Sequence, residues 1–397
     1  MKKLSLDSNI EVVNDVVEAQ NISNRPKVLM IGAENFGRGG RSVIAWNLTE
    51  PLSQDFQVDF LSKIEVKDPK YFDKIKERQG QIIVEPRTSN KFSKIFMRLF
   101  MLPKSLRKEK YDISHINADD AWEAMKGILF AKLSGINCFV VHAHNTKSNH
   151  KNKIGKLLIF FSQKYLLNFS NLEKVACSQE AARFLFGFSE DVTIIENGIC
   201  LEDYTFNQIT RQETRERLGI SEQAQIVGTV GRLSEQKNPL FILNIIEELV
   251  KMDPTYQFIW IGDGELKDEL VIKSKEKGLM DYIKFLGNRS DVNNLLQVFD
   301  VFILPSLYEG FGIVNIEAQV LGLPCLVSDA VPDLAKVNDN FHFLSIKEGA
   351  RVWAQHIITI KDQRIQSNNL ELFRQGGFDI KQGAEKLRAS YELLSTK

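Results

Sequence analysis

Short apolar runs of strand length alternate with helical patterns along most of the chain, and this alternation restricts the fold more than any other feature. Strands separated by helical crossovers form a parallel sheet. The first half has such runs at 27–32, 57–61, 81–84, 112–116, 138–142, 173–177 and 192–195. The second half has them at 227–230, 257–262, 283–286, 301–305 and 324–327. The pattern predicts an α/β protein with two parallel sheets.

The length of 397 residues exceeds the usual size of one hydrophobic core and indicates two domains. The stretch 197–214 is polar and lacks strand periodicity, so we place the linker there. We expect an N-terminal domain over 1–203, with a polar extension at 1–24, and a C-terminal domain over 204–380.

The composition, 43% hydrophobic and 26% charged, is that of a folded globular protein. Four scattered cysteines lack Cys-x-x-Cys spacing and indicate reduced core residues rather than metal ligands or disulfides. No apolar run approaches the ~20 residues of a membrane span. Residues 1–24 also lack the apolar centre of a signal peptide. These features predict a cytoplasmic protein.

Two glutamates bracket a glycine turn that follows the apolar run 301–305: Glu309, then Gly310-Phe311-Gly312-Ile313, then Glu317. A glycine turn that leads into a helix frees backbone N–H groups, which attract anions such as phosphate. Carboxylates repel phosphate, so they are better suited to accept hydrogen bonds from sugar hydroxyls. A ligand with both phosphate and hydroxyl groups, such as a nucleotide sugar, fits this segment.

Two cations, Arg232 and Lys237, follow the run 227–230 and precede a helical pattern. Because parallel strands end at the same edge of a sheet, we expect these cations to face the same ligand as the Glu309 turn. The alternative is that they are solvated loop charges.

Several short motifs in this region resemble the C-terminal domain of the family 4 retaining glycosyltransferases, which have the GT-B fold. They are Gly231-Arg232 with Lys237, Gly262-Asp263-Gly264, Gly287-Asn288-Arg289 and Glu309-x7-Glu317, and the likeness is densest over 225–330. Looser matches occur upstream in the same order, at Gly39-Gly40, His142-Ala143-His144-Asn145, Ala176-Cys177-Ser178 and Asn197-Gly198-Ile199.

The resemblance implies two Rossmann-like domains that face each other across a cleft, with a terminal helix over 381–397 that returns to the first domain. It also implies a nucleotide-sugar donor, with UDP as the expected nucleotide. Glu309 would contact the transferred sugar and Glu317 the ribose. Around the donor would lie Gly264, Asn288, the backbone of Gly310, Phe311, Gly312 and Ile313, and, from the first domain, Gly39 and Gly40.

Catalysis is expected to depend on Glu309, Arg232, Lys237 and a histidine. His142 and His144 end the run 138–142, and the resemblance favours His144, with His115 a weaker candidate. A His-x-His metal pair would lack a third ligand nearby. The chain has no Asp-x-Asp, the pair that holds a divalent ion in many glycosyltransferases. We therefore expect no metal and no cofactor, with cations stabilising the leaving diphosphate.

Basic charge is concentrated in two segments that also contain apolar residues at helical spacing. Residues 91–110 hold seven basic residues and one acid, and residues 147–164 hold five lysines and no acid. Such segments can lie on an anionic membrane surface. The alternative is an ordinary helix whose apolar face lies in the core. Nucleic acid is a poor partner, because the net charge is zero and no recognised binding motif occurs.

The function predicted from these residues is retaining transfer of a hexosyl group from a nucleotide sugar to a glycan hydroxyl. The resemblance to exopolysaccharide and capsule transferases suggests a polyprenyl-linked acceptor at the inner face of a bacterial membrane. One alternative is a non-catalytic GT-B partner subunit. Another is a different Rossmann-type enzyme, which is less favoured because no Gly-x-Gly-x-x-Gly follows Ile31.

Overall fold

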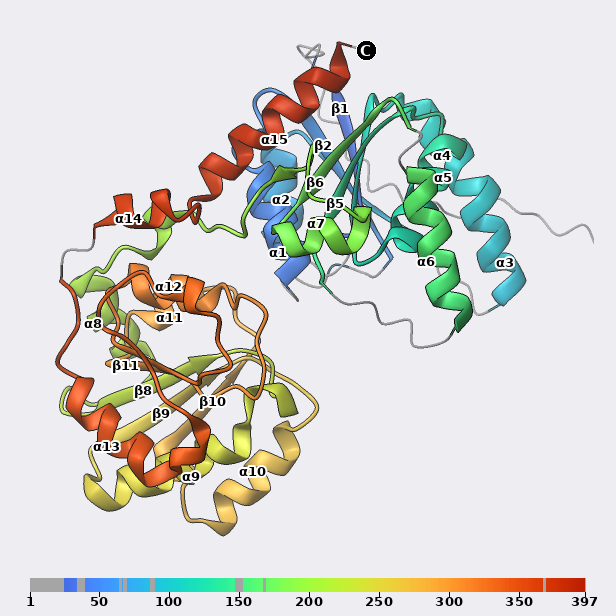
Figure 1. Ribbon diagram of the computed structural model, residues 1–397. Helices are drawn as coiled ribbons and strands as arrows, with labels where there is room; N and C mark the ends of the chain where they lie inside the picture. Colours follow the sequence, from blue (N-terminus) through green and yellow to red (C-terminus); the bar gives the residue numbers. More distant parts are fainter. Residues whose placement is uncertain are drawn as a thin grey trace, which may run out of the picture. The chain divides into compact units, whose positions relative to one another are not determined.

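The computed structural model describes residues 25–33, 40–63, 66, 70–85, 90–146, 153–166, 169–366 and 369–396. The chain divides into two compact units, one formed by residues 1–197 with 380–397 and the other by residues 198–379 (Figure 1). Each unit has one parallel sheet with helices packed on it. The predicted α/β class with two parallel sheets is therefore confirmed.

The described sheet of the first unit has the strand order β3-β2-β1-β4-β5-β6-β7, and every pairing is parallel. All seven predicted runs are strands, with ends within two residues of those expected. Their bounds are β1 (Lys27–Ile31), β2 (Gln57–Ser62), β3 (Ile82–Val84), β4 (Ile113–Ala118), β5 (Cys138–Ala143), β6 (Leu172–Ala176) and β7 (Thr193–Ile194).

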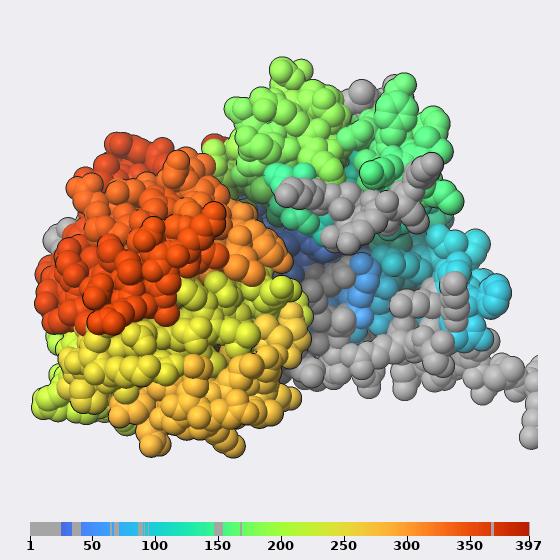
Figure 2. Space-filling model, turned by 60° about the horizontal axis from the view of Figure 1, so that its bottom comes forward, coloured from blue at the N-terminus to red at the C-terminus, as the bar shows by residue number. Residues whose placement is uncertain are grey.

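Helices α3 and α6 lie at the surface of this unit, in the cyan and green parts of Figure 2. Helix α5 begins where the Asp120 side chain accepts a hydrogen bond from the Glu123 N–H at 2.9 Å. A π-helical turn, Met97–Met101, joins α3 to α4. The helices are α1 (Gly40–Thr49), α2 (Lys70–Glu77), α3 (Lys91–Phe96), α4 (Leu102–Leu106), α5 (Ala121–Leu133), α6 (Lys153–Leu166) and α7 (Gln179–Phe186).

The C-terminal helix α15 (Ile380–Ser395) packs on the first unit, against α1, β4 and β5, as predicted. Its Tyr391 is fully buried, and the Tyr391 hydroxyl lies 2.7 Å from Nδ1 of His115 on β4. A Cβ at Gly383 would lie 2.9 Å from Ile195, so the glycine permits this close approach. The return of the chain is thus fixed by burial and by polar contacts, which include the ion pairs of Lys386 with Glu196 and of Arg388 with Asp55.

The described sheet of the second unit has the order β10-β9-β8-β11-β12-β13, again all parallel. The five predicted runs are strands, namely β8 (Gln225–Val230), β9 (Tyr256–Ile261), β10 (Ile283–Gly287), β11 (Val301–Leu304) and β12 (Cys325–Val327). The sequence missed β13 (Phe341–Phe343), because three residues at a sheet edge are too few to show a period. The remaining helices are α8 (Gln208–Arg217), α9 (Pro239–Met252), α10 (Lys267–Glu276), α11 (Val292–Leu296), α12 (Val314–Val320), α13 (Ala350–Ile360) and α14 (Leu370–Gln375).

Residues 198–203, which the sequence assigned to the first domain, belong to the second unit, and the expected linker 197–214 contains the start of α8. The N–H of Ile199 donates to the carbonyl of Phe378 at 2.9 Å, and Leu201 is fully buried beside Ile316. These contacts tie the segment to the second unit before α8 begins.

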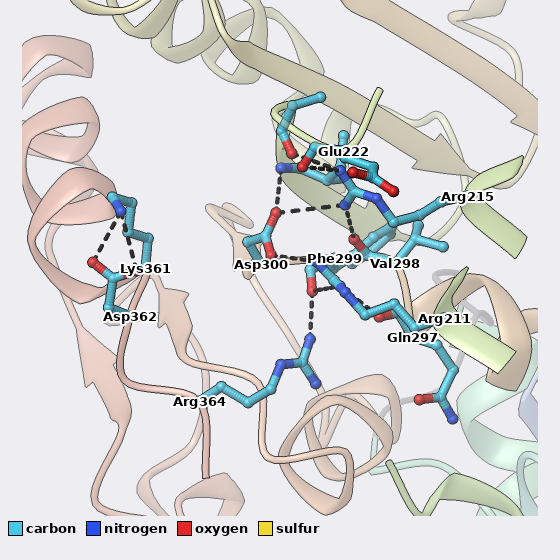
Figure 3. Close-up of polar contacts among 12 residues, drawn as sticks. Arg211, Arg215, Glu222, Gln297, Val298, Phe299, Asp300, Lys361, Asp362 and Arg364 are labelled. Carbon is cyan, nitrogen blue, oxygen red and sulfur yellow. Dashed lines mark hydrogen bonds and ion pairs between the residues drawn. The ribbon is translucent and has the colours of Figure 1, made fainter. Parts of the chain in front are cut away.

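Helix α8 is attached by arginines rather than by an apolar stripe, which is why its polar sequence gave no helical signal. Figure 3 shows the carboxylate of Asp300 between Arg211 and Arg215. Arg211 also donates to the carbonyl of Gln297 at 2.7 Å, and Arg215 to that of Ala224 at 2.8 Å. Asp300 accepts from the N–H of Ile226, near the start of β8, so this cluster lies at the amino edge of the sheet. Its role is structural.

In each sheet the strand order reverses direction at one place, between β1 and β4 in the first unit and between β8 and β11 in the second. Ligands of open α/β sheets bind outside the carboxyl ends of the strands at such a switch point. The loops that follow β8 and β11, and those that follow β1 and β4, are therefore where a site is expected.

Candidate functional site

Lys237 and Glu309 meet at the switch point of the second unit. Lys237 ends the short helical turn Glu235–Lys237 after β8, and Glu309 follows β11, the strand paired with β8. Nζ of Lys237 lies 2.5 Å from Oε1 of Glu309, and their side chains are 13% and 5% exposed. The Ser306 hydroxyl donates to the same oxygen at 2.8 Å. The described residues donate no hydrogen bond to Oε2 of Glu309, so that oxygen remains available to a hydroxyl group.

Backbone and amide hydrogen bonds hold the same two loops together. The N–H of Leu307 donates to the carbonyl of Gln236 at 2.8 Å. The side-chain amide of Gln236 donates to the carbonyl of Tyr308 at 3.0 Å. The geometry of the Lys237–Glu309 pair is therefore set by the backbone of both loops, which favours a preorganised site.

The turn after Glu309 keeps its backbone donors available. Within the described residues, no hydrogen bond is donated by the N–H groups of Gly310, Phe311, Gly312 or Ile313. Gly312 has φ +68°, a conformation suited to glycine, and a Cβ at Gly310 would meet open space. Phe311 instead stacks on Phe378 with ring centroids 5.2 Å apart. The side chain of Phe311 thus packs against Phe378, while the consecutive backbone N–H groups of the turn offer an anion site.

Glu317, on α12, accepts a hydrogen bond from the Tyr204 hydroxyl at 2.9 Å. Burial raises the pKa of Glu317 to about 7, and the hydrogen bond from Tyr204 opposes this only in part. The carboxyl therefore changes its charge close to neutral pH, at a position predicted to contact the ribose.

Arg232 follows Gly231 at the end of β8 and is 72% exposed, with its Nε 3.0 Å from Oε2 of Glu265. The neighbouring glycines have packing reasons of their own. A Cβ at Gly264 would lie 2.3 Å from the carbonyl oxygen of Leu233, and one at Gly262 would lie 2.0 Å from that of Gly231. The loops after β8 and β9 can approach so closely only because these positions are glycine.

Asn288 is exposed at the end of β10, directly after Gly287, which has φ +66°. Arg289 beside it binds Asp291 through two hydrogen bonds of 2.8 Å. The Arg289 cation is therefore engaged within the loop, and the backbone around Asn288 remains the candidate for contact with a base.

In the first unit, His144 lies just beyond β5 and contacts Asn117 of β4. Nε2 of His144 is 2.8 Å from Oδ1 of Asn117, and the Asn117 amide nitrogen donates to the carbonyl of Ile31 at 3.1 Å. Since the Asn117 nitrogen is used as a donor, its oxygen must accept the proton of Nε2. This arrangement leaves Nδ1 of His144 as a hydrogen-bond acceptor.

His144 lies in a row of three histidine rings. The ring centroids of His142 and His144 are 4.2 Å apart, and those of His115 and His142 are 5.5 Å apart. Burial lowers the pKa of His142 to about 3 and holds the pKa values of His115 and His144 well below their usual range, so all three rings are neutral. Among the described residues, no group of three or more His, Cys, Asp or Glu side chains could hold a metal ion.

The structure describes one of the two glycines predicted in the first domain. Gly39 lies outside the described residues, and Gly40 is the first residue of α1. Arg41, which follows, forms ion pairs with Asp119 at 2.9 Å and Glu123 at 3.3 Å. A cation thus lies next to the expected glycine loop and is bound to the loop after β4.

The sequence did not indicate Asn117, Ser306, Gln236 or Tyr204. Asn117 could have been found as a polar residue near the carboxyl end of an apolar strand, which is where His115 and His144 were sought. Ser306, Gln236 and Tyr204 are loop or turn residues whose contacts arise only after folding, and no spacing reveals them.

Known proteins resemble this chain along most of its length. Residues 210–372 match the family model described as Glycosyl transferases group 1. EpsF of Bacillus subtilis (strain 168), named as a glycosyltransferase, is 30% identical over 94% of this chain and 98% of its own. An Escherichia coli protein named UDP-Gal:alpha-D-GlcNAc-diphosphoundecaprenol alpha-1,3-galactosyltransferase is 30% identical over 74% of this chain and 78% of its own.

A solved structure of Anabaena HepE in complex with UDP and glucose superposes with a TM-score of 0.70, at 18% identity, over 93% of this chain and 99% of that one. This likeness concerns the fold. The parallel sheets, the terminal helix on the first unit and the full-length similarity to EpsF agree with one another. The chain belongs to the group 1 glycosyltransferases, family 4, and has their GT-B fold.

Proposed function

We propose that this glycosyltransferase moves a hexosyl group from a UDP-sugar to a hydroxyl of a lipid-linked glycan, with retention of anomeric configuration and without a metal ion. The observation that carries the proposal is the Lys237–Glu309 pair beside the available N–H groups of Gly310 to Ile313. This arrangement places a cation and backbone donors, suited to a diphosphate, next to a carboxylate suited to a sugar.

The reaction breaks the bond between the anomeric carbon and the diphosphate, so negative charge develops on the leaving phosphate. Arg232, Lys237 and the N–H groups after Glu309 are assigned to stabilise that charge. Oε2 of Glu309 is assigned to a sugar hydroxyl and Glu317 to the ribose, with Gly264 and Asn288 bordering the donor. In the first unit, His144, with Gly39 and Gly40, is assigned to the sugar and diphosphate. Arg232 and Lys237 supply the cationic charge that a metal ion provides in other glycosyltransferases.

The nature of the donor and acceptor is supported by relatives. The E. coli relative is named for a UDP-galactose donor and a diphosphoundecaprenol-linked acceptor, and HepE was solved with UDP and glucose. EpsF and this chain share nearly their whole length. We extend the UDP-sugar donor and the lipid-linked acceptor to this chain. We propose that it is a polysaccharide-synthesis enzyme that works peripherally at the cytoplasmic face of the membrane. Among the described residues, no helix combines the length and apolar character needed to cross a bilayer.

The experiment is a panel of UDP-, GDP- and ADP-sugars assayed for slow donor hydrolysis without acceptor, with the anomer of the first product identified by NMR. We expect one UDP-hexose to be hydrolysed with retention and Glu309→Gln to be inactive. In a parallel thermal-shift titration, UDP but not NAD should raise the melting temperature. A protein that binds UDP yet turns over no sugar would instead be the non-catalytic partner subunit.

A further inference from the structure

Two helical segments of the first unit expose their apolar side chains instead of burying them. In α3 and the following π-helical turn, Phe92 is 83% exposed, and Ile95, Phe96, Leu99, Phe100 and Met101 are exposed as well. In α6, Ile154 is 71% exposed, and Leu157, Phe160, Phe161 and Tyr165 are also exposed. The alternative of an ordinary helix with its apolar face in the core is therefore wrong for these residues.

The exposed residues form stripes along each helix. Phe92, Phe96 and Phe100 follow one another at intervals of four residues, and the rings of Phe96 and Phe100 lie 5.4 Å apart. On α6 the side buried in the unit is narrow and contains small residues, with Gly155 and Ser162 beside Ile159 and Leu166. The larger apolar residues of α6 are consequently left on the outside.

The two stripes belong to one layer of helices. Helix α5 packs against α6 and also against the π-helical turn and α4, so it connects the two segments. Leu129 of α5 is exposed too. Figure 1 shows α3, α4, α5 and α6 together on one side of the first unit, and Figure 2 shows both segments at its surface. We call the exposed apolar residues of α3, the π-helical turn, α5 and α6 the apolar helical surface.

All charged residues within the two helical segments are basic, and Arg98 is paired with Glu85, whose Oε1 lies 3.8 Å from Nε of Arg98. Residues 91–101 contain Lys91, Lys94 and Arg98, residues 153–166 contain Lys153, Lys156 and Lys164, and neither segment contains an acid. Nζ of Lys164 lies 4.8 Å from the centre of the Phe160 ring. A second copy docked through the same surface would bring like charges together. A partner rich in negative charge, with an apolar interior behind that charge, is complementary to the surface.

We propose that the apolar helical surface inserts into the facing leaflet of an anionic lipid bilayer, with the exposed Lys156 and Lys164 at the headgroups. Phenylalanine and leucine side chains enter the boundary between headgroups and acyl chains, while cations bind lipid phosphates. The inference rests on the proposed function, because a polyprenyl-linked acceptor is presented at such a surface. It adds that apolar insertion, and not charge alone, holds the enzyme there.

The test compares two matched triple variants in sedimentation with phosphatidylglycerol vesicles. The first is Phe92→Ser with Phe96→Ser and Phe161→Ser. The control is Ile209→Ser with Ile272→Ser and Leu334→Ser, three equally exposed apolar residues of the second unit. We expect the first variant to lose about tenfold or more in partition coefficient and the control to match the wild type. Lys156→Gln with Lys164→Gln should lose only the salt-sensitive part of binding.

Insertion itself is measured with the Phe96→Trp variant. Vesicles of brominated phosphatidylglycerol should quench the fluorescence of the new tryptophan, and vesicles of unbrominated phosphatidylglycerol should not. The inference is overturned if the wild type does not bind anionic vesicles at low salt, if the first triple variant binds like the wild type, or if the tryptophan is not quenched. Light scattering that shows a dimer broken by that variant would identify the surface as a contact between copies. Donor hydrolysis is measured on the same preparations. If the wild type binds vesicles but does not hydrolyse a donor, the proposed function is refuted and the inference about the apolar helical surface is not.

Discussion

Nζ of Lys237 lies 2.5 Å from Oε1 of Glu309, although the two residues are 72 positions apart in the chain. The contact joins the loops after two paired strands, and both side chains are largely buried. The cation expected to bind the diphosphate and the carboxylate expected to bind the sugar are therefore ion-pair partners. Each fixes the position of the other.

The first prediction concerns stability. Lys237→Met leaves the Glu309 carboxylate buried without its cation and should destabilise the second unit by about 3 kcal/mol. Lys251→Met removes an exposed ion pair to Glu247 and should change the free energy of unfolding far less. Urea unfolding of both variants measures the difference. In the double variant with Glu309→Gln, the cost should be well below the sum of the single costs; additive costs would show that the pair contributes no coupling.

The second prediction concerns turnover. Glu309→Gln, Arg232→Ala and Lys237→Ala should each lower kcat/KM about 100-fold or more, which corresponds to about 2.7 kcal/mol of transition-state stabilisation. Arg217→Ala, which removes a solvent-exposed partner of Asp291, is the control and should be neutral. The assignment of the diphosphate site would be wrong if the Arg232 and Lys237 variants both kept near wild-type turnover.

The third prediction follows from the raised pKa of Glu317, about 7. The ionised carboxylate accepts hydrogen bonds from ribose hydroxyls better than the protonated form, so UDP affinity should rise as pH increases from 6 to 8. Calorimetric titration across this range measures the dependence. Glu317→Gln should bind UDP more weakly, and its UDP affinity should lose the part of the pH dependence that arises from the protein. The part that arises from titration of the nucleotide phosphate should be the same in the variant and the wild type. Identical pH profiles would exclude Glu317 from the nucleotide site.

The same shift has a consequence for folding. Because the folded-state pKa exceeds the usual value of 4.5, the folded protein holds this proton more tightly than the unfolded chain does. The stabilising contribution is present below pH 4.5 and is lost as pH rises through 7. Glu317→Gln should therefore stabilise the second unit at pH 8 relative to the wild type, and less so at pH 5.

The fourth prediction tests Asn117 as a positioning residue for His144. Asn117→Leu removes the acceptor at 2.8 Å and should lower kcat about tenfold or more, with little change in the KM for the donor. Asn117→Asp keeps an acceptor and should restore activity at high pH. Its carboxylate would raise the pKa of His144, so the activity of this variant should fall as pH decreases. A flat pH profile in the Asp variant would contradict a role for the His144 tautomer.

The fifth prediction is that activity persists in excess EDTA. It is motivated by the absence of Asp-x-Asp from the sequence and by the cation and N–H donors gathered around Glu309. Turnover is measured before and after exhaustive chelation, with re-added Mg²⁺ and Mn²⁺ as controls. Loss of activity that either ion restores would refute the metal-independent mechanism.

The sequence predicted the strands well because each is an apolar run between helical patterns, and parallel order then brought Lys237 and the Glu309 turn to one sheet edge. Helix α8 was not predicted, because the guanidinium groups of its arginines attach it to the second unit and its sequence lacks the apolar periodicity of a helix. The Tyr204–Glu317 and Asn117–His144 contacts arise between distant elements, so no local spacing encodes them. For α3 and α6, the helical spacing of apolar residues predicted an apolar stripe, but the packing of neighbouring helices decides which side of each helix faces water.

Helix α15 also has a consequence for the order in which the chain can fold during synthesis. The second unit is continuous in sequence, from 198 to 379, and all of its strands are made before α15. The first unit lacks Tyr391, the partner of His115, until α15 has left the ribosome. The first unit is thus completed only after the second unit has been synthesised, and its face over β4 and β5 must avoid aggregation, or be held by a chaperone, while the second unit forms.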